Sequence, residues 1–334
     1  MSFKAEKITV GDNDKIAVLE IISTGNTLKI DIFKELLVSF VVVPSIDVIS
    51  KEDYVKIEIY IGSPPKEILC LLTGLKWLQL TSSGVDGYDN PTLYENYDKV
   101  IITNAAGVYG VPISEYVIGV MCLMSKYAIS NNLKKRKLGM DRNFHIEIRQ
   151  ANILILGLGD IGLHVAELCK GFSCKKVIGV NRLGVCSNSN VDETYKIDDL
   201  ISIVPQADYI ISALPDTENT GGIFHKAVFE AMKCTAILIN VGRGNAVVQS
   251  DLVYAMKQKL ISGAVLDVTS PDPLPFWHPL RRCQRVFLTE HRSAYSQFNM
   301  NRANELYISQ IHKYLNGQPL VNIKNIVLAD CGEV

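Results

Sequence analysis

Short apolar runs alternate with amphipathic stretches along the whole chain. A short run of aliphatic and β-branched residues is typical of a buried strand, whereas apolar positions three and four residues apart are typical of a helix. Their regular alternation predicts an α/β fold with mainly parallel strands. The expected strands form an early series, Lys15–Ile21, Val41–Pro44, Ile57–Ile61, Trp77–Leu80 and Val100–Thr103, and a late series, Ala151–Leu156, Lys176–Val180, Tyr209–Ala213, Ala236–Val241, Gly263–Val268 and Arg285–Thr289.

Helical stretches separate most strands of the late series. This rhythm of strand and helix predicts a doubly wound sheet. A longer helix is expected between the two series, and the last helix is expected to end at the stop signal Asn316-Gly317-Gln318-Pro319. The expected helices are Pro112–Leu133, Ile161–Lys170, Ile197–Val204, Lys226–Met232, Gln249–Gln258 and Gln297–Leu315.

Composition narrows the functional classes. A chain of 334 residues suggests about two domains, and 34 Lys and Arg against 35 Asp and Glu give a net charge of −1. This balance offers no electrostatic reason to expect a nucleic-acid or acidic-membrane partner. The eight cysteines lack zinc-site spacing, the N-terminus lacks the apolar core of a signal peptide, and the most apolar helical stretch is too short to cross a bilayer. We therefore expect a cytoplasmic protein without a metal site.

A glycine loop, Gly157-Leu158-Gly159-Asp160-Ile161-Gly162, directly follows the first apolar run of the late series and opens a helical stretch. In this context the first glycine permits a tight turn, the second permits close approach of a pyrophosphate, and the third permits close contact between helix and strand. Backbone N–H groups and the helix dipole then bind the phosphates. The loop predicts a dinucleotide site; a structural turn without a ligand is the alternative.

The strand Lys176–Val180 is followed by Asn181 and Arg182 rather than by an acid. An acid at this point of a dinucleotide fold binds the adenosine ribose hydroxyls. Asn can bond a ribose without repelling a 2′-phosphate, and Arg can pair with that phosphate. The pair therefore favours NADP(H) over NAD(H), with an exposed loop Arg of no such role as the alternative.

Three further segments carry charged residues where buried strands end. Arg243 lies between two glycines, Asp272 follows Asp267 by five residues, and His291 comes just after the last strand. Open α/β sheets bind ligands at the carboxyl ends of their strands. A guanidinium suits a carboxylate with an adjacent keto oxygen, and His is the usual proton donor for keto reduction. A carboxylate behind the ring would orient it and stabilise its protonated form. Taken singly, a surface Arg and a chemically idle loop His remain open.

The order of glycine loop, Arg, carboxylate and His, each at a strand end, resembles the D-isomer-specific 2-hydroxyacid dehydrogenase family, which includes hydroxypyruvate and glyoxylate reductases and phosphoglycerate dehydrogenases. The resemblance covers nearly the whole chain and is strongest from Lys76 to His291. The matching segments are Thr81–Asp86, like the family's substrate-carboxylate loop; Asn104–Tyr116, like its crossing into the cofactor domain; Leu214-Pro215 with Thr217 and Thr220, like its nucleotide-lining segment; Asn240–Gly244, like its Arg motif; and Leu266-Asp267-Val268, like the strand whose Asp meets the nicotinamide amide.

The resemblance implies two doubly wound parallel-sheet domains, a Rossmann cofactor domain inserted into a flavodoxin-like substrate domain. For this chain we expect the substrate domain at residues 1–104 and 293–334 and the Rossmann dinucleotide-binding domain at residues 105–292. Two subunits would form a homodimer through their cofactor domains, using the long helix after Pro112.

The resemblance also assigns roles. Arg243 would bind the substrate and polarise its carbonyl, His291 would be the general acid/base with Asp272 as its partner, and Ser83 and Gly84 would offer amides to the substrate carboxylate. The residues implied for NAD(P)H binding are Gly157, Gly159, Asp160, Ile161, Gly162, Asn181, Arg182, Leu214, Pro215, Thr220, Val241, Gly242, Asp267 and His291.

Two positions depart from the family pattern. Asp272 stands where the family usually has Glu, which makes the partner of His291 one methylene shorter. Glu290 stands where the family has Pro, directly before His291. Because neighbouring side chains of an extended segment point to opposite sides, we do not expect Glu290 to replace Asp272. Neither change removes a required chemical group.

Two functions compete. The first is an NAD(P)H-dependent reductase of a small 2-keto acid such as hydroxypyruvate or glyoxylate, with phosphoglycerate dehydrogenase as a possibility of the same class. The second is an NAD(H)-sensing interaction protein, like the corepressors that resemble this family. The chain keeps Arg, carboxylate and His together and has no long disordered tail for recruiting partners, which favours the enzyme.

Overall fold

The computed structural model describes residues 6–8, 16–20, 40–43, 46–85, 87–88, 90–94, 99–126 and 147–328. These residues divide into two compact units, one drawn from Met1–Val108 and Gln297–Val334 and the other from Tyr109–Ser296. The domain boundaries expected after residues 104 and 292 each lie four residues before those of the units. Within the described ranges, no helix is both long and apolar enough to span a membrane.

The first unit is built on a sheet whose described strands run in the order β1-β3-β2-β4-β5-β6-β14. The five strands from β3 to β6 are mutually parallel in the flavodoxin-like order, and the edge strands β1 and β14 pair antiparallel with β3 and β6. The elements are β1 (Glu6–Ile8), β2 (Ile16–Glu20), β3 (Phe40–Val43), β4 (Ile57–Ile61), β5 (Trp77–Gln79), β6 (Lys99–Thr103), β14 (Ile323–Leu328), α2 (Lys66–Leu69), α8 (Asn299–Leu315) and the 3-10 helices η1 (Ile46–Val48), η2 (Lys51–Lys56) and η3 (Pro91–Tyr94).

The C-terminal helix α8 belongs to this first unit. Tyr314 on α8 stacks on the fully buried Trp77 with ring centroids 5.4 Å apart, and its hydroxyl donates to Glu58 Oε1 at 3.0 Å. Gln310 is also fully buried and donates to the Val321 carbonyl at 2.7 Å. The chain therefore returns to its first unit after the second is complete.

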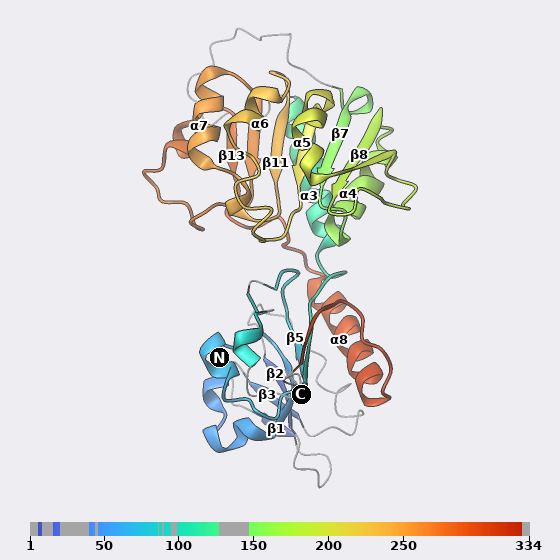
Figure 1. Ribbon diagram of the computed structural model, residues 1–334, viewed down its shortest axis with the longest axis vertical. Coiled ribbons are helices and arrows are strands. Elements are labelled where there is room, and N and C mark those ends of the chain that lie inside the picture. The colour runs from blue at the N-terminus through green and yellow to red at the C-terminus, as the bar shows by residue number, and fades with distance from the viewer. Residues whose placement is uncertain are drawn as a thin grey trace, which may run out of the picture. The chain divides into compact units, whose positions relative to one another are not determined.

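The second unit is built on a fully parallel sheet with the order β13-β12-β11-β10-β7-β8-β9 (Figure 1). Strand order reverses between β7 and β10, which is the Rossmann arrangement, so the predicted fold class is confirmed. The elements are β7 (Asn152–Leu156), β8 (Lys176–Asn181), β9 (Glu193–Lys196), β10 (Tyr209–Ser212), β11 (Ile237–Asn240), β12 (Gly263–Leu266), β13 (Val286–Leu288), α3 (Gly110–Ser125), α4 (Asp160–Gly171), α5 (Leu200–Ile203), α6 (Lys226–Ala231), α7 (Gln249–Gln258) and the 3-10 helices η6 (Ile148–Gln150), η7 (Ile197–Asp199), η8 (Val204–Gln206), η9 (Gly244–Ala246) and η10 (Pro279–Arg282).

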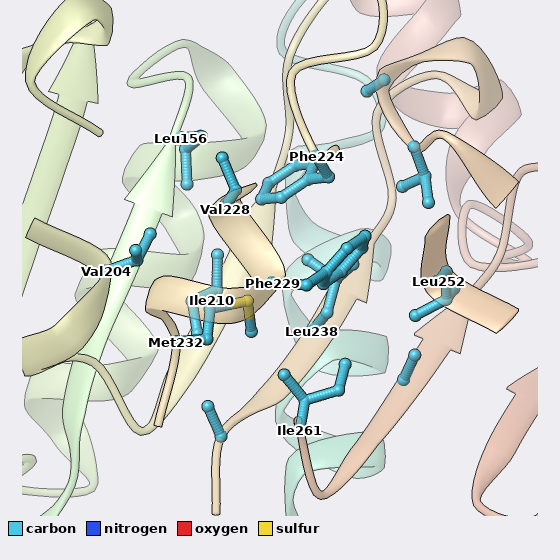
Figure 2. Close-up of a cluster of buried hydrophobic side chains, with 14 of the residues drawn as sticks. Leu156, Val204, Ile210, Phe224, Val228, Phe229, Met232, Leu238, Leu252 and Ile261 are labelled. Atoms are coloured by element: carbon cyan, nitrogen blue, oxygen red, sulfur yellow. The ribbon is translucent and has the colours of Figure 1, made fainter. Parts of the chain in front are cut away.

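Strand alternation divides the core of the second unit into two layers. Ile153 and Ile155 of β7 pack with α3 and α4, whereas Leu154 and Leu156 pack with α5, α6 and α7. Figure 2 shows the second layer, where Phe229 of α6 lies among strand and helix side chains. A parallel strand is buried on both faces, which is why these strands read as continuous apolar runs.

The structure differs from the expected elements in three places. Strands β1, β9 and β14 were not predicted, because β9 is a polar edge strand and the other two lack a clear apolar run. The helix expected over Ile197–Val204 is instead a 3-10 turn followed by the four-residue α5. Helix α3 begins at Gly110, two residues before the expected Pro112, and ends at Ser125, eight residues before the expected Leu133, which itself lies outside the described residues.

Candidate active site

The glycine loop joins β7 to α4. Gly157 has φ +93°, and a Cβ there would lie 2.7 Å from the Ala213 carbonyl oxygen, so the tight turn requires glycine. A Cβ on Gly162 would overlap the Gly157 carbonyl, whereas a Cβ on Gly159 would meet nothing within 4 Å. Gly159 also lacks a side-chain cap for the N–H groups of α4. The loop therefore has the close turn, the close helix contact and the open amide-lined face that a pyrophosphate needs.

Asp160 and Ile161 form the first turn of α4. The Asp160 carboxylate points toward His164 and Gly110. Its Oδ1 lies 3.3 Å from His164 Nδ1, and a Cβ on Gly110 would lie 2.7 Å from the same oxygen. Oδ2 is buried and has no hydrogen-bond partner. Ile161 is half-buried against the layer formed with α3 and α4. These two residues can contact a cofactor through their backbone, while their side chains contact the protein.

Asn181 and Arg182 end β8 in different environments. The Asn181 amide donates to the Val185 carbonyl at 2.8 Å and accepts from the Gly184 N–H at 2.7 Å, so this side chain closes its own turn. Arg182 is exposed. The structure thus gives Asn181 a local role that the sequence pattern did not predict, and leaves Arg182 as the cation at this strand end.

The ends of β10 and β11 lie against each other. Leu214 is buried, and a Cβ on Gly242 would lie 2.5 Å from the Leu214 carbonyl oxygen, so glycine is needed for this approach. Thr220 is buried and donates to the Pro215 carbonyl at 2.6 Å, which fixes the loop after β10. Val241 is buried beside Gly242. All of these residues are at the same sheet edge as the glycine loop.

Arg243 follows β11 at that edge. Asn240, which is fully buried, donates to the Arg243 carbonyl at 2.9 Å and accepts from the Gly242 N–H at 3.2 Å, so one side chain fixes the turn. Arg243 Nη1 donates to the Gly242 carbonyl at 3.0 Å, and a Cβ on Gly244 would overlap Thr269. The guanidinium is half-buried and is aimed by a rigid backbone.

Asp267 at the end of β12 is almost fully buried and holds the segment after β13. Its Oδ1 accepts from the Thr289 hydroxyl at 2.6 Å and from the Arg292 N–H at 2.8 Å, and both carboxylate oxygens lie 3.1 Å from the Ser293 N–H. The Asp267 carbonyl accepts from the His291 N–H at 2.6 Å. This carboxylate therefore anchors the loop that carries His291, a role the sequence did not indicate.

Tyr116 of α3 extends this network. Its hydroxyl lies 2.7 Å from Thr289 Oγ1, and because Thr289 donates its only proton to Asp267, Tyr116 is the donor. Burial raises the pKa of Tyr116, so the hydroxyl keeps its proton. Neither Tyr116 nor Thr289 was predicted as a site residue, although Thr289 stands only two residues before His291.

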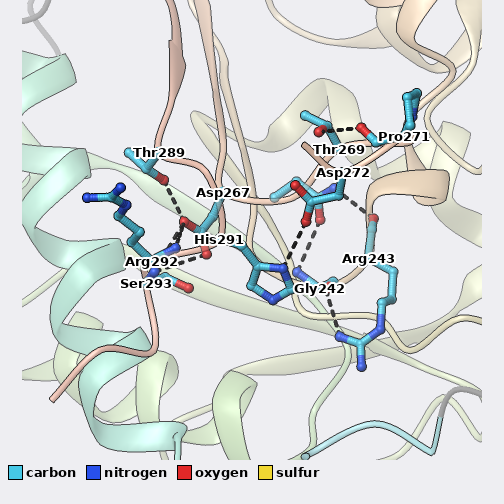
Figure 3. A network of polar contacts seen from close by, with 11 residues as sticks. Gly242, Arg243, Asp267, Thr269, Pro271, Asp272, Thr289, His291, Arg292 and Ser293 are labelled. Atoms are coloured by element: carbon cyan, nitrogen blue, oxygen red, sulfur yellow. Dashed lines mark hydrogen bonds and ion pairs between the residues drawn. The ribbon is translucent and has the colours of Figure 1, made fainter. Parts of the chain in front are cut away.

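His291 and Asp272 come together although they lie on separate loops. His291 Nδ1 is 2.9 Å from Asp272 Oδ2, with side chains 59% and 30% exposed. In Figure 3 the His291 and Arg243 side chains extend in the same direction, with Asp272 above the imidazole. The shorter carboxylate thus reaches the ring, and its contact with Nδ1 leaves Nε2 available to a ligand.

The backbone at Glu290 and His291 is not extended, contrary to the expectation from the sequence. Glu290 and His291 have φ of +54° and +59°, in the left-handed region. Glu290 Oε1 lies 3.4 Å from Arg281 Nη1 rather than near His291. The expectation that Glu290 does not replace Asp272 agrees with these contacts, but its reasoning from extended geometry was wrong.

The loop after β5 in the first unit was expected to bind a carboxylate. Asn104 donates to the Ser83 carbonyl, and Ser82 Oγ donates to the Gly84 carbonyl at 2.6 Å. The Ser83 hydroxyl is buried without a hydrogen-bond partner. The Ser83 and Gly84 carbonyls are thus bonded within the protein, whereas the Ser83 hydroxyl can still donate a hydrogen bond to a ligand. Asp86 lies outside the described residues.

Together the second unit offers a dinucleotide loop, a guanidinium and an imidazole with a carboxylate partner at one sheet edge. Such a set can bind an anion, polarise a carbonyl and exchange a proton. Among the described residues, no group of three or more His, Cys, Asp or Glu is placed to hold a metal ion.

Comparisons with known proteins agree with this arrangement. The profile of the D-isomer specific 2-hydroxyacid dehydrogenase NAD binding domain matches residues 120–293. A Corynebacterium melassecola protein, described as an uncharacterized protein in the proB 3′ region, is 30% identical over 269 residues, which are 80% of this chain and 87% of that protein. Human glyoxylate reductase/hydroxypyruvate reductase is 31% identical over 177 residues, which are 52% of each protein, so the match spans about half of that enzyme.

A solved structure extends the likeness to nearly the whole chain. A D-isomer specific 2-hydroxyacid dehydrogenase family protein from Aeromonas salmonicida has a TM-score of 0.76 and 28% identity, covering 94% of this chain and 99% of that one. The fold, the profile match and the constellation of glycine loop, Arg243, Asp272 and His291 agree. The chain belongs to the D-isomer-specific 2-hydroxyacid dehydrogenase family of NAD(P)-dependent oxidoreductases.

Proposed function

We propose that this enzyme reduces a small 2-keto acid, such as hydroxypyruvate or glyoxylate, to the D-2-hydroxy acid. The observation that carries the proposal is the 2.9 Å contact between His291 and Asp272 at the sheet edge that also bears Arg243 and the glycine loop. A protonated imidazole beside a guanidinium suits a carbonyl that carries a neighbouring carboxylate.

In the proposed reaction, the glycine loop Gly157–Gly162 would hold the nicotinamide dinucleotide, which when bound would supply the hydride for the keto carbon. Arg243 binds the substrate carboxylate and polarises the keto oxygen, and His291 gives that oxygen a proton, so C=O becomes CH–OH. Asp272 holds the imidazole through Nδ1, which orients the ring and leaves Nε2 for the substrate. The Ser83 and Gly84 amides are proposed to hold the substrate carboxylate as well. In the oxidative direction His291 accepts the proton.

The proposed cofactor is NADP(H). No carboxylate stands at the end of β8 to bind ribose hydroxyls and repel a 2′-phosphate, and the exposed Arg182 can pair with that phosphate. Because Asn181 closes its own turn, Arg182 is the residue proposed to carry the preference. Arg182→Gln should raise the KM for NADPH about tenfold and leave the KM for NADH within twofold. Equal changes for the two cofactors would refute the assignment.

The decisive experiment is a panel of 2-keto acids assayed with NADH and NADPH, on the wild-type protein and on His291→Gln. We expect His291→Gln to lower kcat by about 10²- to 10⁴-fold while nucleotide binding, followed by cofactor fluorescence, persists. His225→Gln is the matched control, since His225 is exposed at the N-cap position of α6, where its side chain makes no capping hydrogen bond. Near-normal turnover by His291→Gln would refute the proposed role of His291 as the proton donor.

A nucleotide sensor without turnover is not favoured, because the chain belongs to an enzyme family and retains a complete acid/base pair. Within the enzyme class, the phosphoglycerate dehydrogenase alternative is separated by including 3-phosphohydroxypyruvate in the substrate panel.

We also propose a homodimer formed through the cofactor unit by way of α3. Leu123 on that helix is 42% exposed although it is apolar, which suits a helix face covered by a second copy. Light scattering on a sizing column should give twice the 37.0 kDa chain mass, and Leu123→Glu should shift the equilibrium to monomer.

A further inference from the structure

The ion pair between His291 and Asp272 is by itself too weak to hold the two loops that carry these residues. His291 and Asp272 are substantially exposed, and exposed ion pairs contribute only about 0–1 kcal/mol. Such a pair does not fix its own spacing, so the 2.9 Å contact depends on how the two backbones are supported. On the His291 side that support includes Asp267, which anchors the loop from behind.

Arg281 in η10 touches both loops. On one side, Nε donates to the carbonyls of Leu274 at 3.2 Å and Pro275 at 3.1 Å, and Nη2 donates to the Leu274 carbonyl at 2.6 Å. On the other side, Nη1 and Nη2 each lie 3.4 Å from Glu290 Oε1. Leu274 is two residues after Asp272 and Glu290 directly precedes His291, so a single guanidinium spans both loops.

Glu290 gives this bridge its second end. A Pro at this position would have no carboxylate for Arg281 and could not adopt φ +54°, because its ring fixes φ near −65°. The two contacts with Glu290 are long for hydrogen bonds, so their contribution is mainly the charge attraction of a half-exposed pair. The shorter bonds to Leu274, a buried core residue, fix the guanidinium itself.

We infer that Arg281 is a positioning residue that sets the distance between Asp272 and His291 by joining their loops through Leu274 and Glu290. The inference rests on the proposed role of His291 as the acid/base. It assigns no contact between Arg281 and the substrate. Loss of the bridge lets the carboxylate move away from the imidazole, so the ring is less well oriented for proton transfer.

The test compares Arg281→Met with Arg282→Met in the full chain. Arg282 is the next residue of the same turn, is exposed, and has no hydrogen bond or ion pair with either loop. Arg281→Met should lower kcat for 2-keto acid reduction about tenfold while it leaves the KM for NADPH and the KM for the 2-keto acid within twofold. Arg282→Met should match the wild-type protein in all three measurements.

Variants of Glu290 cover the case in which Arg281→Met folds poorly, which thermal unfolding would reveal. Glu290→Gln keeps the contacts of Arg281 with Leu274 and should lower kcat about two- to threefold. In the Arg281→Met background it should have no further effect, because the bridge is already lost. Glu290→Pro, which restores the family residue, should lose more activity than Glu290→Gln because the backbone itself is incompatible.

The outcomes separate the inference from the proposed function. If His291→Gln is inactive but Arg281→Met keeps the kcat of Arg282→Met, the inference is overturned and the proposed function stands. The inference is also overturned if the double variant Arg281→Met/Glu290→Gln loses kcat by the product of the two single losses. An active His291→Gln overturns the proposed function itself.

Discussion

Replacing Thr289 by Val tests the buried network behind the candidate active site. Val has the same shape as Thr but no hydroxyl, so the variant removes two bonds at once: Thr289 to Asp267 at 2.6 Å and Tyr116 to Thr289 at 2.7 Å. A bond to a charged acceptor contributes about 1.5–3 kcal/mol, and an unpaired hydroxyl costs about 1–3 kcal/mol when buried and less at the half-buried Tyr116. We expect Thr289→Val to lower the free energy of unfolding by about 2–4 kcal/mol.

The Tyr116→Phe variant separates the two terms. Alone it removes one neutral bond and leaves the contact with Asp267 intact, so it should cost about 1 kcal/mol. In the Thr289→Val background it removes the unpaired hydroxyl, so the double variant should be more stable than Thr289→Val alone. Urea midpoints followed by circular dichroism give these values, and Thr194→Val on the edge strand β9 is the matched control.

The same variants connect the network to catalysis. Asp267 receives the backbone N–H groups of Arg292 and Ser293, and its own carbonyl receives that of His291. Without the Thr289 bond the carboxylate is less well fixed, and we expect kcat to fall about tenfold. If Thr289→Val unfolds within 0.5 kcal/mol of the wild-type protein, about the scatter of a neutral substitution, or if the double variant is the least stable of the series, the reasoning is wrong.

Three further predictions concern the cofactor loop, an ion pair and the acid/base partner. Gly162→Ala should lower the free energy of unfolding by about 1–3 kcal/mol, because its Cβ would overlap the Gly157 carbonyl. Gly159→Ala should fold normally but lose nucleotide affinity, because its Cβ would occupy the open face of the loop. Equal melting temperatures of the two variants would contradict this. Partial burial pushes the pKa of Asp192 up, but Lys170 and a backbone amide outweigh it and the net pKa is lowered, so Asp192→Asn should cost about 1 kcal/mol at pH 7. Stability from a lowered acid pKa is lost as pH falls through the folded value, so the urea midpoints of wild-type and variant should converge below the ordinary Asp pKa of about 3.9. Asp272→Glu, although it restores the family residue, should lower kcat about tenfold because the longer side chain misplaces the carboxylate; an increase would show that the spacing is not set by the loops.

Much of the cofactor unit was predictable because its signals are local. A fully buried parallel strand needs a continuous apolar run, as in Asn152–Leu156, and the sharp turn after it needs glycine at Gly157. Parallel strands end at one edge, so residues that directly follow them are brought to one place whatever their separation along the chain. That is why Arg243 and His291 could be proposed for one site from the order of these segments, although their roles came only from the family resemblance.

The remaining features depend on tertiary contacts that no periodicity reports. Asp267 was assigned to the cofactor, yet its carboxylate also binds three backbone or hydroxyl donors from the segment after β13. Asn181 closes its own turn, a use of the amide that a ribose-binding role would not require. The left-handed backbone at Glu290 follows from neither residue type nor pattern, since only the surrounding contacts stabilise it.

The two departures from the family pattern concern a single distance. An Asp in place of Glu shortens the reach to the imidazole by one methylene, so the loop backbones must lie closer for a 2.9 Å contact to form. A residue other than Pro before His291 permits the left-handed backbone seen there, and a carboxylate at that position gives Arg281 a second loop to hold. We therefore expect Asp272→Glu and Glu290→Pro each to disturb the spacing of the pair, because each changes one of the two supports of the same 2.9 Å contact.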